Sequence, residues 1–167
     1  LHGDLHTGSV MVSDSGDYRV IDPEFATYGP MGFDVGMLIS NFLMAYLSQP
    51  GHETNAAERA AFQDWLLATT TEIWDSFATE FARLWRSERT GILYPATLYE
   101  DQGHSLASDL ALAQRLAAIW RDALGICGVE MHRRILGLAH NADFEKIPDE
   151  SLRAACDTAD SRAPGVC

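Results

Sequence analysis

The sequence LHGDLHTGSVMVSDSGDYRVIDPEF, residues 1–25, alternates polar, glycine-containing segments with two short runs of β-prone residues. The runs at 9–12 and 18–21 are separated by SDSGD, a composition typical of a turn because glycine adopts a positive φ without steric cost. We therefore predict a β-hairpin. Asp4 precedes this hairpin and Asp22 follows it, so the fold can bring the two carboxylates to one face of the same small sheet. That arrangement suits a site that handles protons or a metal ion.

Three polar clusters follow one another near the start of the sequence: 2–9 (HGDLHTGS), 22–25 (DPEF) and 32–36 (GFDVG). A carboxylate beside glycine in a loop is most often a turn former or a helix cap, and each cluster alone would be interpreted that way. Three such clusters in succession favour a functional site.

Two kinds of chemistry are compatible with these residues. His2, Asp4 and His6 alternate as H-x-D-x-H and could ligate zinc, although the neighbouring glycines favour an irregular loop over the extended strand that this site needs. Phosphoryl transfer requires an Asp that orients the attacking hydroxyl and further carboxylates that hold Mg²⁺ on the phosphates. Asp22 and Glu24 provide the oxygen ligands that Mg²⁺ prefers.

Helical patterns dominate after Asp34, which we interpret as a helix N-cap. The predicted helices cover 34–47, 55–89 with a break near 69–71, 105–124, 129–140 and 150–157. Glycines at 125 and 128 are expected to separate the third helix from the fourth. The sequence thus predicts an α+β fold that is mainly helical, with regular strands only between about residues 9 and 21.

The composition indicates one folded domain of 167 residues, with 47% hydrophobic and 22% charged residues. The net charge of −12 disfavours nucleic acid and anionic membrane surfaces as partners. No stretch approaches the roughly 20 apolar residues of a membrane span. The three cysteines form neither a CxxC nor an even-numbered disulfide framework, so we expect a cytoplasmic protein.

The first cluster, HGD with Ser9 five positions after the Asp, resembles the catalytic loop of the protein-kinase-like fold of aminoglycoside and choline phosphotransferases. Asp22 stands where that fold has the metal-binding Asp of its D-F-G segment. The motifs that together resemble the methylthioribose kinases are HGDLHTGS at 2–9, DPEF at 22–25, GPMGFDVG at 29–36 and the adjacent Arg133 and Arg134.

The resemblance implies a set of catalytic and metal-binding roles. Asp4 is implied to be the base that accepts the proton of the sugar 1-hydroxyl and to contact the sugar. Asp22 and Glu24 are implied to bind Mg²⁺ together with Ser9, which occupies the position of a metal-binding Asn. A hydroxyl is a weaker Mg²⁺ ligand than the amide carbonyl of an Asn, and the carboxylate of Glu24 would compensate for the missing amide.

The resemblance also implies that His2 and Asp34 support the catalytic loop, Asp34 by accepting backbone hydrogen bonds. Arg133 and Arg134 would otherwise be interpreted as a solvated basic face. Adjacent residues point about 100° apart on a helix, so the two arginines cannot be equally buried. The resemblance implies that they contact the hydroxyls of methylthioribose and the transferring phosphate, whose geometry suits guanidinium groups.

At the level of domains, the resemblance implies that residues 1–167 form the C-terminal lobe of an ATP- and Mg²⁺-dependent kinase. This kinase would phosphorylate the 1-hydroxyl of S-methyl-5-thioribose in methionine salvage, and a homodimer is compatible with it. The sequence lacks the phosphate-covering loop and ATP-anchoring lysine of an N-terminal lobe, so we expect that an upstream lobe precedes it and that the chain alone is inactive. After about Ser151 the sequence departs from the family pattern, and the extreme C-terminus, which ends DSRAPGVC at 160–167, is expected to be irregular.

Three alternatives remain open from the sequence. The first is another small-molecule kinase of the same fold, acting on an aminoglycoside, choline, homoserine or a fructosamine, which would lack D-P-E combined with the two arginines. The second is a non-catalytic module that retains the fold. The third is a metal-dependent hydrolase built on His2, Asp4 and His6, which zinc analysis would separate from the kinases.

Overall fold

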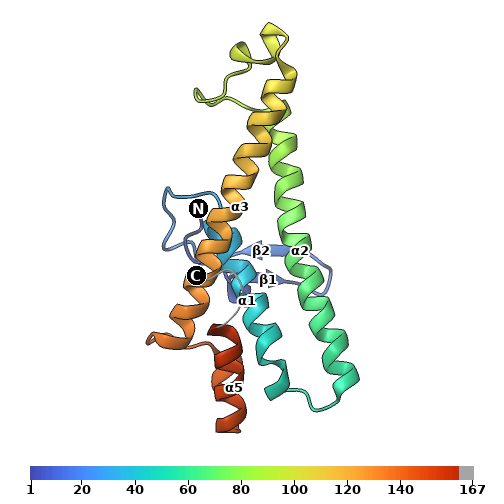
Figure 1. Ribbon diagram of the computed structural model, residues 1–167, viewed down its shortest axis with the longest axis vertical. Helices are drawn as coiled ribbons and strands as arrows, with labels where there is room; N and C mark the ends of the chain where they lie inside the picture. Colours follow the sequence, from blue (N-terminus) through green and yellow to red (C-terminus); the bar gives the residue numbers. More distant parts are fainter. Residues whose placement is uncertain (162–167) are drawn as a thin grey trace.

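The computed structural model describes residues 1–161 and consists mainly of helices with one two-stranded sheet (Figure 1). Its elements are η1 (Thr7–Ser9), β1 (Val10–Val12), β2 (Tyr18–Val20), α1 (Phe33–Ser48), η2 (Gln49–Gly51), α2 (Ala56–Ser87), η3 (Ala96–Leu98), η4 (Glu100–Gln102), α3 (Ser105–Leu136), α4 (Ala142–Glu145) and α5 (Glu150–Ser161). Among the described residues, regular strands occur only in the predicted hairpin. Of the stretch expected to be irregular, residues 160 and 161 belong to α5 and 162–167 lie outside the described residues.

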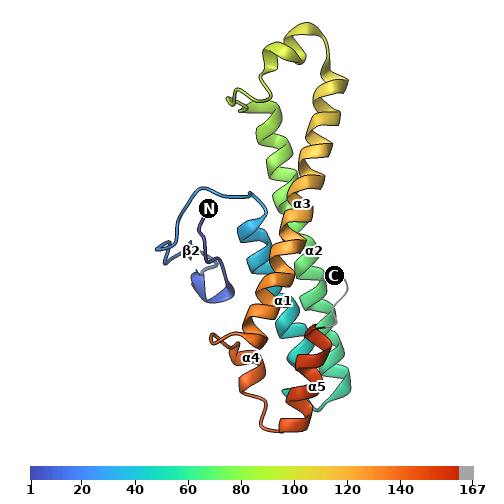
Figure 2. The same cartoon turned by 60° about the vertical axis from the view of Figure 1, so that its left-hand side comes forward.

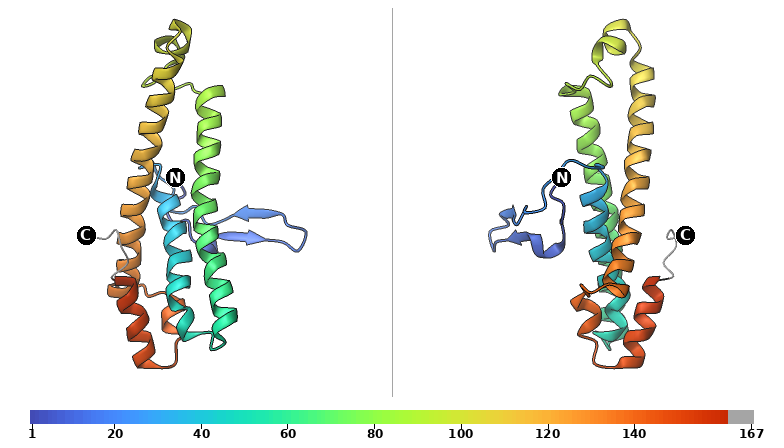
Figure 3. Two further views of the ribbon diagram at one scale, coloured as in Figure 1. Left: turned by 45° about the vertical axis from the view of Figure 1, so that its right-hand side comes forward. Right: turned by 90° about the vertical axis from the view of Figure 1, so that its left-hand side faces the viewer.

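The strands β1 and β2 form the predicted antiparallel hairpin, with Val10 opposite Val20 and Val12 opposite Tyr18. Gly16 has a φ of +85° in the connecting turn, as a glycine at this position allows. The hairpin projects sideways from the helices, and most of its side chains are exposed (Figures 1 and 3). The backbone N–H of Ile21, which follows β2, donates to the carbonyl oxygen of Ser9, which precedes β1, at 2.9 Å. This hydrogen bond joins the two open ends of the hairpin.

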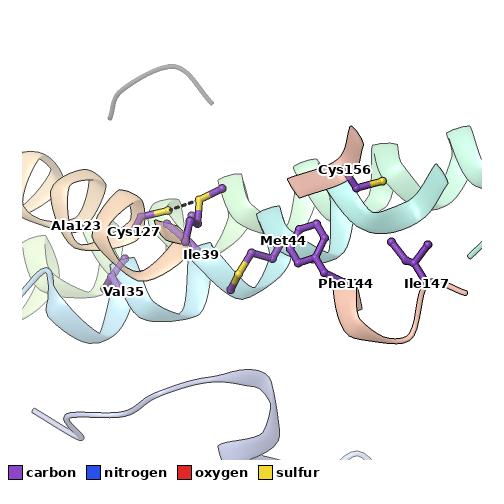
Figure 4. Close-up of a cluster of buried hydrophobic side chains, with 9 residues drawn as sticks. Val35, Ile39, Met44, Ala123, Cys127, Phe144, Ile147 and Cys156 are labelled. Carbon is purple, nitrogen blue, oxygen red and sulfur yellow. Dashed lines mark hydrogen bonds between the residues drawn. The ribbon is translucent and has the colours of Figure 1, made fainter. Parts of the chain in front are cut away.

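The helices α2 and α3 form a long antiparallel pair, and α1 packs most extensively against α3 and then against α2 (Figures 1 and 2). The core lies where α1, α3, α4 and α5 meet (Figure 4). Its buried apolar side chains are Val35, Ile39, Met44, Ala123, Cys127, Met131, Phe144, Ile147 and Cys156. Along residues 1–161, no helix has both the length and the apolar character required to cross a membrane.

Two glycines bring the backbones of α1 and α3 into direct contact. A Cβ on Gly32 would lie 2.4 Å from Ile119 O, and a Cβ on Gly36 would lie 2.3 Å from Ala123 O. A side chain at either position would therefore push the helices apart. This contact fixes the start of α1, which carries Asp34, against the middle of α3.

Two predicted interruptions of helices are wrong. The helix α2 continues through the three threonines, where Thr69 Oγ1 donates to Trp65 O at 2.9 Å and Thr70 Oγ1 donates to Leu67 O at 2.7 Å. The helix α3 continues through Gly125 and Gly128 to residue 136. A glycine inside a helix costs about 1 kcal/mol relative to alanine, and the burial of the α3 face that packs on α1 offsets this cost.

Candidate active site

Asp34 holds the backbone of the HGD segment. Its carboxylate accepts the backbone N–H of His2 at 2.7 Å and that of Gly3 at 2.9 Å. The interpretation of Asp34 as a helix N-cap is wrong, because the N-cap of α1 is Gly32 and Asp34 lies in the first turn. Its carboxylate is thus available to satisfy two donors of a loop that is distant in sequence.

His2 connects this loop to the end of the hairpin. Its Nδ1 accepts the backbone N–H of Asp4 at 3.3 Å, which leaves Nε2 as the protonated nitrogen. Nε2 lies 2.8 Å from the carbonyl oxygen of Ile21, the residue before Asp22. Because both ring nitrogens of His2 are engaged with backbone groups, neither is available to zinc, and the H-x-D-x-H interpretation does not fit this geometry.

The backbone of Gly3 lies against the backbone of the DPEF segment. Gly3 has a φ of +87°, and a Cβ at this position would lie 2.2 Å from Phe25 O. Glycine is thus required for two independent reasons, the left-handed conformation and the close approach. The HGD and DPEF segments, which the hairpin separates in sequence, are in direct contact.

The Asp4 side chain is about one-third exposed, with an exposed fraction of 32%. His6 Nδ1 accepts the backbone N–H of Gly8 at 3.0 Å, so its Nε2 carries the proton and faces Asp4 Oδ2 at 3.8 Å. The buried Ser9 hydroxyl donates to the carbonyl oxygen of Asp4 at 3.1 Å. Ser9 therefore stabilises the loop that carries Asp4, and its role as a metal ligand stays a prediction.

Asp22 and Glu24 are exposed carboxylates beside the loop. Asp22 has a φ of +64°, a conformation that costs a non-glycine residue energy. Among residues 1–161, neither carboxylate forms a hydrogen bond or ion pair, and no group of three His, Cys, Asp or Glu side chains is placed to hold a metal by itself. Two unpaired oxygen donors fit an ion that takes its remaining ligands from phosphates and water.

Arg133 and Arg134 lie in the last turn of α3 and share one carboxylate, that of Glu130. Arg133 donates from Nε and Nη2 at 2.7 and 2.8 Å, and Arg134 donates from Nε at 2.6 Å. The hydrogen bonds to Glu130 raise the pKa of Arg133, and the charge of Asp4 raises it further, while partial burial lowers it.

The two arginines face different surroundings. Arg134 lines a cavity of about 280 Å³ whose other lining side chains include His140, Arg153 and Asp157, and neither Asp4 nor Arg133 lines it. Arg133 is the more exposed of the two, at 46% of its side chain against 21%. The sequence interpretation missed Glu130, although an acidic residue between the buried Cys127 and Met131 is an unusual member of an apolar helix face.

Comparison with known proteins shows what the chain is similar to. The chain matches the phosphotransferase enzyme family over residues 1–75, which includes the HGD and DPEF segments and α1. It is 43% identical over 159 residues to methylthioribose kinase 1 of Oryza sativa subsp. japonica, a match that covers 94% of this chain and 36% of the rice protein.

Bacterial relatives are similar to the same extent. Methylthioribose kinase of Escherichia coli is 43% identical over 157 residues, covering 94% of this chain and 37% of that protein. Methylthioribose kinase of Yersinia pseudotuberculosis is 40% identical over 156 residues, covering 93% and 35%. The chain thus spans little more than a third of the length of these relatives. The chain is therefore similar to the phosphotransferase enzyme family over residues 1–75 and to part of the methylthioribose kinases along 94% of its own length.

Proposed function

We propose that this chain is the C-terminal lobe of a kinase that transfers the γ-phosphoryl group of ATP to the 1-hydroxyl of S-methyl-5-thioribose. The observation that carries the proposal is the junction of HGD and DPEF, in which Asp34, His2 and Gly3 fix Asp4 beside the segment that bears Asp22. The identity of 40–43% to curated methylthioribose kinases supports this substrate over the other small-molecule acceptors.

Asp4 is proposed as the catalytic base. The sugar oxygen attacks the γ-phosphorus, the bond from that phosphorus to the bridging oxygen breaks, and ADP leaves with the electron pair. The hydroxyl proton passes to the carboxylate of Asp4. Its side chain is partly exposed, so a substrate hydroxyl can reach it, while its backbone N–H and C=O are fixed by His2 and Ser9.

Asp22 and Glu24 are proposed to hold Mg²⁺, which would neutralise charge on the phosphates of ATP. Their fit to this role rests on two exposed carboxylates that have no ion-pair partner among the described residues. The left-handed backbone of Asp22 is a further support, since strain of this kind is retained where function requires a side chain that glycine lacks.

Arg133 and Arg134 are proposed to bind the sugar and the transferring phosphate. Arg133 is the stronger candidate for the phosphate, because its side chain is the more accessible of the two and its guanidinium keeps three N–H bonds free of Glu130. Arg134 is proposed to act at the edge of the site, since it lies between Glu130 and a separate cavity.

The remaining part of the enzyme is proposed to be an N-terminal lobe that covers ATP from the other side. Large apolar side chains between Asp22 and α1 are exposed, among them Phe25 at 58% and Tyr28 at 104%. Exposed apolar surface beside a candidate active site is typical of an interface. The chain alone would then lack half of the phosphate-binding site and would not phosphorylate methylthioribose.

A substrate panel tests the proposal. The full-length protein that contains this chain is assayed with ATP and Mg²⁺ against methylthioribose, ribose, choline and an aminoglycoside, and ADP formation is measured. We expect kcat/KM to be highest for methylthioribose by at least tenfold. A preference for choline or an aminoglycoside would overturn the substrate assignment, and no turnover of any acceptor would favour a non-catalytic module.

A further inference from the structure

We propose that Glu130 is a positioning residue that fixes the guanidinium groups of Arg133 and Arg134 in the active site, an inference that rests on the proposed function. Glu130 is only 3% exposed. A buried carboxylate is costly unless it is paired, and removal of one partner leaves an uncompensated charge. Here both partners are the arginines that the substrate is proposed to contact.

The geometry explains how one carboxylate can orient two side chains. Arg133 and Arg134 follow Glu130 by three and four residues on α3, so both lie on its side of the helix even though they point about 100° apart. Arg133 pairs side-on, with Nε on one oxygen and Nη2 on the other, which fixes the plane of its guanidinium. Arg134 donates only from Nε.

The pairing leaves most guanidinium donors for a ligand. Of the five N–H bonds of an arginine, Arg133 uses two and Arg134 uses one in the contacts to Glu130. The remaining N–H bonds of Arg133 are thus held in a defined orientation toward a ligand. The one negative charge of Glu130 compensates only one of the two arginine charges. The triad retains a net positive charge, which suits the phosphoryl group in transfer to the sugar.

An exposed pair elsewhere in the protein gives a matched control. Glu80 and Arg83 have the same spacing on α2 and the same two-bond geometry, at 2.9 and 2.7 Å, but both side chains are more than half exposed. Glu80→Gln removes an equivalent carboxylate without touching the arginines at the end of α3. Effects specific to Glu130 can therefore be separated from the general effect of breaking a helix ion pair.

The test compares Glu130→Gln, Glu130→Asp and Glu80→Gln in the full-length protein. We expect Glu130→Gln to raise the KM for the phosphoryl acceptor by at least tenfold, or to lower kcat by as much, while the KM for ATP stays within twofold. Glu130→Asp keeps the charge and is expected to give a smaller change in the same direction. Glu80→Gln should change neither KM. Equal changes in both KM values, or a lower acceptor KM, would overturn the inference.

A double-mutant cycle with Arg133→Lys shows whether Glu130 acts through Arg133. If it does, adding Glu130→Gln to Arg133→Lys lowers kcat/KM for the acceptor by less than a further threefold. If the double variant instead shows the product of the two separate losses in kcat/KM, Glu130 does not act through Arg133. An NMR experiment tests whether Glu130 holds the two guanidinium groups, and it does not depend on enzyme activity. The Nε–H signals of Arg133 and Arg134 should exchange slowly with water in the wild type and fast in Glu130→Gln. Inactivity of the wild type toward methylthioribose would overturn the proposed function alone, and unchanged Nε–H exchange would overturn the positioning role.

Discussion

The Nε2 atom of His2 lies 2.8 Å from the carbonyl oxygen of Ile21, and this contact joins the HGD loop to the end of β2. Ile21 in turn donates its backbone N–H to Ser9, whose hydroxyl binds the carbonyl oxygen of Asp4. The loop that carries Asp4 and the strand that leads to Asp22 are therefore held by a closed set of hydrogen bonds. The side chains of His2 and Ser9 thus hold the backbone segments that carry Asp4 and Asp22 in a fixed position relative to each other.

The contact between Gly3 and Phe25 predicts a strong effect of Gly3→Ala. Gly16→Ala is the matched control, because Gly16 also has a positive φ but a Cβ added there would have open space around it. We expect Gly16→Ala to cost about 1–2 kcal/mol of unfolding free energy, the cost of the left-handed conformation, without a change in kcat. Gly3→Ala should cost more and should also lower kcat. Urea unfolding and steady-state kinetics check both, and equal effects of the two variants would contradict the close contact.

The contact between α1 and α3 predicts opposite effects of two Gly→Ala changes. Gly125→Ala adds a methyl group in open space on α3 and should stabilise the helix by about 0.5–1 kcal/mol. Gly36→Ala forces a Cβ to within 2.3 Å of Ala123 O and should destabilise the protein. Thermal unfolding measures both. Stabilisation by Gly36→Ala would show that the helices are not in backbone contact.

The left-handed backbone of Asp22 predicts that two substitutions at this position differ in their effect on stability but not in their effect on activity. Asp22→Gly should be more stable than Asp22→Ala by about 1 kcal/mol, because only glycine adopts a φ of +64° without strain. Both variants should lose Mg²⁺-dependent turnover in the full-length protein. If Asp22→Ala were as stable as Asp22→Gly, the backbone at this position would not be strained.

The sequence predicted the hairpin and the helical remainder because both have local signals. The turn SDSGD and the flanking β-prone runs lie within a few residues of one another, and apolar spacing identifies α1, α2 and α3. The continuity of α3 through its glycines was not predictable in this way, since packing on α1 outweighs helix propensity.

The candidate site shows the same limit. The HGD and DPEF motifs were evident, but the roles of the Ser9 hydroxyl and of Glu130 depend on contacts that no spacing rule gives. Asp34 illustrates the reason: its place in a first helical turn gives no local signal for a contact with residues 2 and 3, and its role in holding the loop was expected from the resemblance alone. The catalytic, metal and substrate assignments themselves stay predictions.

The environment of Asp157 predicts a pH-dependent gain in stability. Burial raises the pKa of Asp157 above its ordinary value, although the charges of Arg153 and His140 lower it in part. A raised pKa in the folded state means that protonation favours folding, so this residue's contribution to stability is present at low pH and is lost as the pH rises through the folded-state pKa.

Asp157→Asn should therefore raise the melting temperature at pH 7, with a gain that shrinks toward pH 4. Asp64→Asn, an exposed change on α2, should have little effect at either pH. Calorimetry at both pH values measures the difference. A gain that is constant across this range, or a loss at pH 7, would show that burial of the Asp157 charge does not limit stability.

The most direct test of the central claim, that Asp4 is the base of a methylthioribose kinase, is the turnover of Asp4→Asn in the full-length protein. The amide preserves the shape of the side chain and cannot accept the proton. We predict a kcat reduced by about 10² to 10⁴-fold with ATP affinity, measured by calorimetric titration, within twofold of wild type. A variant that phosphorylates methylthioribose at the wild-type rate would contradict the account.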